Sequence, residues 1–182
     1  IRNLLYEVMA MFDKEYSFKG IHADKVNELT KDFDNSGNKL FVRNLDVYIL
    51  APIVGFLYQR MADVDNTPDI KPTKVFGDIL MKNADQLMFN FRLIMLLDKK
   101  YEPDPEKRIE KAFKGNNSAE DEQRYEQYVR GGVDVLYEKL MEGVANTNDY
   151  VIRLYDFLEE FDDRYNQTID IETMLSLCQK IK

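Results

Sequence analysis

The stretch DFDNSGN, residues 32–38, has the start of a calcium-binding loop. Asp32, Asp34 and Ser36 fall at loop positions 1, 3 and 5, where oxygen ligands are required, and a glycine follows at position 6. The match then ends, because Arg43 occupies position 12, where a bidentate Glu should supply two ligand oxygens. The favoured interpretation is a polar turn between two helices, and no metal site is predicted.

A pair of glycines, Gly131-Gly132, lies inside the helical pattern YVRGGVDVLYEKL. Two interior glycines cost about 2 kcal/mol relative to alanine, so something should offset them. Close packing of two buried helices is the favoured explanation, since the distance between helices depends on side-chain size. The alternative is a groove beside these glycines, in which Arg124 and Arg130 meet an anion.

Two charged faces are the remaining candidate sites. Glu159, Glu160 and Asp163 belong to one acidic run, which is either a solvated helix face or a docking surface for a basic partner. Lys107, Lys111 and Lys114 lie on one side of another predicted helix and form a local basic face. The net charge of -8 disfavours nucleic acid as the partner, because an acidic surface repels phosphate.

Motifs for catalysis or cofactor binding are missing from the sequence. His22 is the only histidine and Cys178 the only cysteine, and neither has ligands at zinc spacing nearby. Pairing these two residues as a nucleophile and its base would require the chain ends to meet. No glycine-rich phosphate-binding pattern occurs either, so no cofactor is predicted.

The elements that must position these residues are helices. Glycine and proline number only 8 and 5, and the apolar residues recur at helical spacing, which predicts an all-α fold. The expected architecture is one helical domain over residues 1–182, a bundle of about seven to eight helices, with an optional division into two lobes near residues 63–72. A helical pattern covers nine segments, 2–14, 23–33, 44–62, 73–82, 85–99, 105–114, 118–142, 147–166 and 170–181, of which 85–99 is a restart directly after 73–82.

Three local features make this prediction specific. Pro52 should kink the helix 44–62 or mark a junction between two helices. Thr73 is expected to cap the helix 73–82. In the helix 147–166, apolar residues repeat at four- and three-residue spacing, which predicts a buried face made of Val151, Leu154, Leu158, Phe161 and Tyr165.

The leading functional hypothesis is a non-enzymatic helical interaction or adaptor protein, or a small subunit of a larger assembly, with a protein partner. An accessory factor in nucleic-acid processing and a carboxylate-based enzyme are the alternatives, and homo-oligomerisation is left open. The longest nearly apolar run, residues 47–58, is too short for a membrane span, which needs about 20 residues. A single cysteine requires no oxidising compartment, so a cytoplasmic location is expected.

Overall fold

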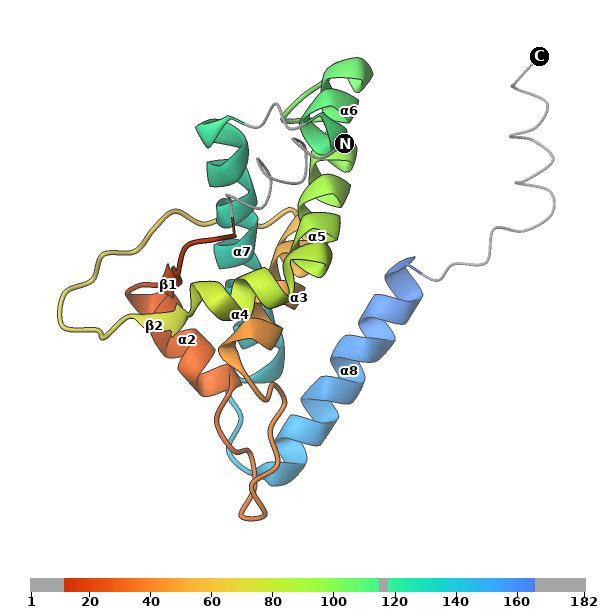
Figure 1. Cartoon of the computed structure of the whole chain (residues 1–182). Coiled ribbons are helices and arrows are strands. Elements are labelled where there is room, and N and C mark those ends of the chain that lie inside the picture. Colours follow the sequence, from red (N-terminus) through yellow and green to blue (C-terminus); the bar gives the residue numbers. More distant parts are fainter. Residues whose placement is uncertain (1–11, 115–117, 166–182) are drawn as a thin grey trace, which may run out of the picture.

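The computed structural model describes residues 12–114 and 118–165. Within these ranges the chain forms seven helices and one two-stranded sheet, which confirms the predicted all-α class. The elements are β1 (Tyr16–Phe18), α2 (Ile21–Leu29), α3 (Asn44–Leu57), β2 (Thr73–Val75), α4 (Gly77–Lys82), α5 (Ala84–Leu97), α6 (Pro105–Phe113), α7 (Ala119–Leu140) and α8 (Thr147–Tyr165). Figure 1 shows α7 running through the molecule and α8 standing at one side of it.

The centre of the fold is the crossing of α3 and α7, where the two backbones touch. A Cβ atom on Gly132 would collide with the carbonyl oxygen of Ala51, and one on Gly55 would collide with that of Tyr128. Gly131 approaches the carbonyl of Arg60 in the same manner. Gly132 and Gly55 thus lie in the contact between α3 and α7, where only glycine permits this separation, whereas Gly131 lies against the segment that follows α3.

α3 continues through Pro52 as one helix, so no second helix starts there. Proline has no N–H for the carbonyl four residues earlier, and its ring crowds the preceding turn. The buried Asn90 of α5 donates from Nδ2 to the carbonyl oxygen of Ile49 at 2.7 Å, within this turn. The carbonyl that loses its helical donor at Pro52 is that of Tyr48, so the bond to Ile49 instead gives the buried Asn90 amide its own partner, as buried polar groups require.

The prediction that Thr73 caps a helix was wrong. Thr73–Val75 forms β2, which pairs antiparallel with β1 so that Tyr16 lies opposite Val75 and Phe18 opposite Thr73. The helix α4 begins only at Gly77. Thr and Val favour strands, but a strand needs a partner, and the partner here lies more than fifty residues earlier in the chain.

Helix boundaries follow the capping residues where these are strong. The carboxylate of Asp104 accepts the backbone N–H groups of Glu106 and Lys107, and the side chain of Ser118 accepts that of Asp121, so α6 and α7 begin where the sequence predicts. The predicted first helix lies mostly outside the described residues, and its last residues, 12–14, are not helical. The predicted helix 170–181 lies outside them entirely.

Candidate interaction surface

Three parallel ridges of side chains along α8 define the candidate surface. The first ridge faces the rest of the described fold, called here the body, and is buried or half-buried. It contains Tyr150, Leu154, Phe157 and Phe161. The second ridge, called here the apolar ridge, is shifted by one residue and consists of Val151, Tyr155 and Leu158. These three side chains are 58%, 64% and 58% exposed. The body thus covers only part of the apolar face of α8.

The predicted buried face of α8 was partly wrong for this reason. Val151 and Leu158 were expected to face inward, yet they are exposed, whereas Phe157 is the deeply buried side chain at 8% exposure. A spacing of four and three residues identifies apolar positions along a helix. This spacing does not show how much of the apolar face a neighbouring helix covers. Here α7 lies beside the first ridge of α8 and leaves the apolar ridge exposed. Tyr155, too, is absent from the predicted face.

Contacts on the body side hold α8 in place. Phe157 stacks against the ring of Tyr58, with ring centroids 6.4 Å apart. The carboxylate of Glu160 accepts hydrogen bonds from the Tyr58 hydroxyl at 3.1 Å and from Nζ of Lys139 at 2.6 Å. The pKa of Glu160 is lowered, first by the Lys139 hydrogen bond and also by Tyr58. Glu160, predicted as part of a docking surface, therefore anchors α8 to the body.

The third ridge, called here the acidic ridge, runs beside the apolar ridge on its other side. It begins at the apolar Ile152, which is 57% exposed, and continues with the exposed acidic residues Asp156, Glu159 and Asp163, spaced three and four residues apart. Asp156 and Glu159 have no ion-pair partner within residues 12–114 and 118–165. The predicted acidic residues Glu159 and Asp163 thus border an apolar surface that no other segment within residues 12–114 and 118–165 covers.

Arg124, a predicted groove residue, belongs instead to a buried charge network between α5 and α7. Its Nε donates to Oδ2 of Asp98 at 2.9 Å, and the same oxygen accepts the Tyr128 hydroxyl at 2.8 Å. Asp98 is 3% exposed. The guanidinium carbon of Arg124 also lies 5.2 Å from the centroid of the Tyr101 ring. These contacts neutralise a carboxylate that would be costly to bury alone.

The basic face on α6 is largely engaged with acidic groups. Nζ of Lys111 donates to Oδ1 of the fully buried Asp121 at 2.6 Å, and Lys114 pairs with Glu110 at 3.0 Å. Lys107 is exposed. Of the three predicted cations, therefore, two already have carboxylate partners in the described structure.

The carboxyl group of Asp121 links this ion pair to the stability of the fold at acid pH. Burial raises its pKa, but hydrogen bonds from Lys111, Ser118 and Tyr101 outweigh burial and hold the pKa below the ordinary 3.8. A depressed pKa contributes stability that is present above the ordinary value and is lost as the pH falls.

We expect the Asp121→Asn variant to be less stable than the wild type at neutral pH. The difference should shrink as the pH falls below about 4, because the carboxyl of the unfolded wild type is protonated first and that of the folded protein only at lower pH. Denaturant unfolding of both proteins across this pH range measures the effect. A difference that stays constant with pH would show that the charge of Asp121 contributes nothing.

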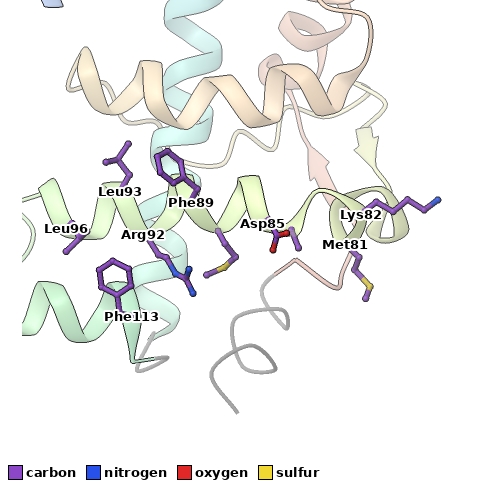
Figure 2. A pocket seen from close by; sticks show the side chains of 10 residues that line it. Met81, Lys82, Asp85, Phe89, Arg92, Leu93, Leu96 and Phe113 are labelled. Atoms are coloured by element: carbon purple, nitrogen blue, oxygen red, sulfur yellow. The ribbon is translucent and has the colours of Figure 1, made fainter. Parts of the chain in front are cut away.

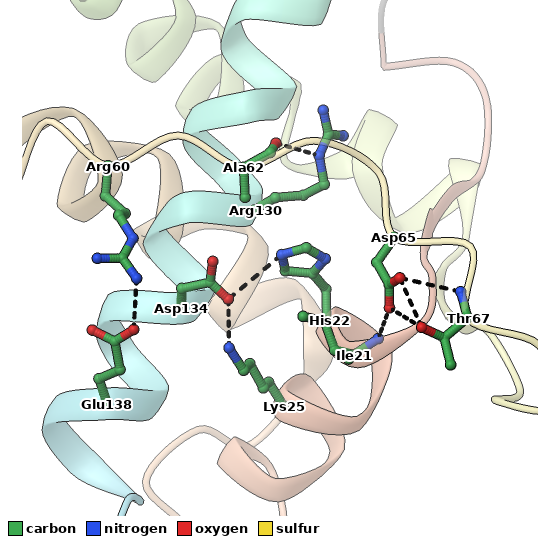
Figure 3. Close-up of polar contacts among 10 residues, drawn as sticks. All are labelled: Ile21, His22, Lys25, Arg60, Ala62, Asp65, Thr67, Arg130, Asp134 and Glu138. Carbon is green, nitrogen blue, oxygen red and sulfur yellow. Dashed lines mark hydrogen bonds and ion pairs between the residues drawn. The ribbon is translucent and has the colours of Figure 1, made fainter.

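Arg130 and the segment 59–72 form a separate polar cluster, shown in Figure 3. Nε of Arg130 donates to the carbonyl of Ala62 at 2.9 Å, and its Nη1 lies 3.2 Å from a carboxylate oxygen of Glu126. Asp65 accepts the N–H of Ile21 at 2.6 Å, at the start of α2. The segment in which a division between lobes was predicted is thus bonded to both α2 and α7.

His22 lies in the same cluster, on the buried side of α2. It is 3% exposed, and its Nε2 is 3.5 Å from Oδ1 of Asp134, which also accepts a 2.6 Å hydrogen bond from Lys25 (Figure 3). Burial raises the pKa of Asp134, but contacts from His22 and Lys25 lower it below the ordinary value. Cys178, considered as a partner of His22, lies outside the described residues.

The calcium-like stretch is a turn whose carboxylates already have donors. Asp34 accepts the backbone N–H groups of Ser36 at 2.9 Å and Asn38 at 3.0 Å through one oxygen. Asp32 lies 3.5 Å from Nζ of Lys39. In the part of the chain that the structure describes, no cluster of three or more His, Cys, Asp or Glu side chains is arranged to hold a metal ion.

A second apolar surface is a groove of about 600 Å³ along α5, shown in Figure 2. Met81 of α4, Phe89 of α5 and Phe113 of α6 contribute to its lining. Lys82, Asp85 and Arg92 also line it, so both signs of charge are present. The groove therefore selects no charge in a partner, in contrast to the ridges of α8. Phe89 is 63% exposed.

No protein-family model, curated protein or solved structure matches this chain. None of the described helices is both long enough and apolar enough to cross a membrane. The predicted site residues do not form one site. Glu159 and Asp163 lie on α8, whereas Arg124, Arg130 and the glycine pair lie in separate contacts along α7.

Proposed function

We propose that this chain is a non-enzymatic helical interaction protein, an adaptor or small subunit that works in the cytoplasm. Its partner is another protein, and the contact is made through the apolar ridge of α8. The single observation that supports this proposal is that Val151, Tyr155 and Leu158 are all more than half exposed on one helix face. Single exposed apolar residues are ordinary, but adjacent ones along a helix are typical of interaction sites.

The position of the ridge supports the same proposal. Tyr155 supplies a large ring with few rotatable bonds, and such residues contribute strongly to interface energetics. The neighbouring acidic ridge supplies a charged rim, so the surface has an apolar centre and a polar edge, which is the usual anatomy of a protein interface.

The test is to purify the full chain from cells that express it, as the wild type and as two variants, Leu158→Gln and Phe89→Gln. Leu158→Gln removes an apolar side chain without changing charge, and glutamine is a good helix former. Phe89→Gln makes the same kind of change in the groove of α5. We expect a stoichiometric partner to remain bound to the wild type and to Phe89→Gln, and to be lost from Leu158→Gln. Retention of the same partner by Leu158→Gln would refute the role of α8.

A further inference from the structure

We infer that the partner segment is a single amphipathic helix that carries lysine or arginine along one edge. The inference rests on the proposed function and adds the chemistry of the partner to it. The apolar ridge of α8 recognises the apolar face of that helix, and the acidic ridge recognises its basic edge.

The shape of the uncovered surface favours a helix over an extended peptide. Val151, Tyr155 and Leu158 stand four and three residues apart, so their ridge is about two helical turns, or roughly 10 Å, long. Ridges with this spacing pack into the grooves between side chains of a second helix. An extended peptide usually binds by adding a strand to a sheet edge, and the backbone groups of α8 are already bonded within the helix.

The charges beside the ridge favour a basic edge. Asp156, Glu159 and Asp163 form one row of a single sign along the border of the apolar ridge. The two arginines of α8 point away from this row, and the guanidinium carbon of Arg164 lies 4.6 Å from the centroid of the Tyr58 ring. Arg153 donates to the carbonyl of Glu142 at 2.9 Å, and Arg164 lies 3.5 Å from Glu160. A basic edge would meet this acidic row, and the net charge of -8 would also speed its approach.

A second copy of this chain fits the surface poorly. If two α8 helices paired antiparallel about a two-fold axis, the acidic ridges of both copies would lie on the same side of the contact, because a two-fold contact matches each patch with itself. Asp156 and Glu159 of one copy would then face the same carboxylates of the other. Like charges across a helix pair destabilise it, so the acidic ridge selects against this dimer.

The experiment uses three labelled helical peptides that share one apolar face and differ along one edge, which carries lysine, glutamine or glutamate. Fluorescence anisotropy with the full chain measures each dissociation constant at low and high salt. We expect the lysine peptide to bind about ten-fold more tightly than the glutamine peptide at low salt, and the glutamate peptide most weakly. High salt should reduce the difference, because exposed ion pairs are screened.

Two sets of variants separate this inference from the proposed function. Asp156→Asn with Glu159→Gln should abolish the preference for lysine, whereas Glu120→Gln with Glu122→Gln on the exposed start of α7 should keep it. Leu158→Gln should weaken binding of all three peptides. Equal binding of the three peptides, with sensitivity to Leu158→Gln, would overturn the basic edge and leave the role of α8 intact. Binding that is insensitive to Leu158→Gln would overturn both.

The remaining outcomes identify another occupant. Sedimentation that shows a dimer of the wild type and a monomer of Leu158→Gln would assign the apolar ridge to a second copy and overturn the inference. If no peptide binds and Leu158→Gln lowers the free energy of unfolding, the ridge is covered within its own chain. That result would overturn both the inference and the proposed function.

Discussion

Replacing Gly132 with alanine is expected to destabilise the protein by about 3 kcal/mol, at the upper end of overpacking effects. The added Cβ would collide with the carbonyl oxygen of Ala51, so α3 and α7 would have to separate along their crossing. This cost outweighs the roughly 1 kcal/mol by which alanine normally favours a helix over glycine. Denaturant unfolding of the purified variant measures the change in the free energy of unfolding.

Two substitutions serve as controls for this prediction. Gln123→Ala changes an exposed residue near the start of the same helix and should alter stability by no more than about 0.5 kcal/mol. A Cβ on Gly37 would meet no atom within 4 Å, so Gly37→Ala tests only the strain of its positive φ of 78°. That strain costs roughly 1–2 kcal/mol. Equal stability of Gly132→Ala and the wild type would contradict the backbone contact between α3 and α7.

The Asp98→Ala variant should lose about 3–5 kcal/mol of stability, because it leaves a mostly buried guanidinium without its carboxylate. The side chain of Arg124 is 18% exposed and that of Asp98 2%, so water cannot replace the lost contact fully. Tyr128 loses the acceptor of its hydroxyl in the same variant. Urea unfolding of the variant and the wild type measures this loss.

A double-mutant cycle separates the ion pair from the packing. Adding Arg124→Met to Asp98→Ala removes the unpaired charge, so the double variant should be more stable than the sum of the two single changes predicts. Glu110→Ala breaks the exposed pair with Lys114 and should cost no more than about 1 kcal/mol. Strict additivity of the two single changes would show that Asp98 and Arg124 do not interact energetically.

The helices and their boundaries could be predicted from the sequence where a local signal determines them. Asp104 and Ser118 each accept backbone N–H groups within the next turn, so the starts of α6 and α7 depend on neighbouring residues only. Thr73 shows the limit of such reasoning. Its preference for a strand has an effect only because Phe18 pairs with it, and that pairing is not visible in a local pattern.

The candidate surface shows the same limit. The acidic residues Glu159 and Asp163 were found from the sequence, because a run of carboxylates on a helix is visible directly. The exposure of Val151 and Leu158 could not be predicted, since it depends on which face of α8 the residues around Tyr58 and α7 contact. The sequence did contain a signal for this exposure in the width of the apolar face. That face spans both the first ridge, with Phe157, and the apolar ridge, with Tyr155, and is broader than one neighbouring helix covers.

The attachment of α8 has a consequence for its local stability. Phe157 is its one side chain at or below 8% exposure within residues 147–164, and the other anchors are polar contacts around Glu160. Segments with few buried contacts open and close independently of the global unfolding of a protein. Amide hydrogens of α8 should therefore exchange with solvent sooner than those of α3 and α7. A bound partner would slow this exchange in α8, and part of its binding energy would be spent on ordering that helix.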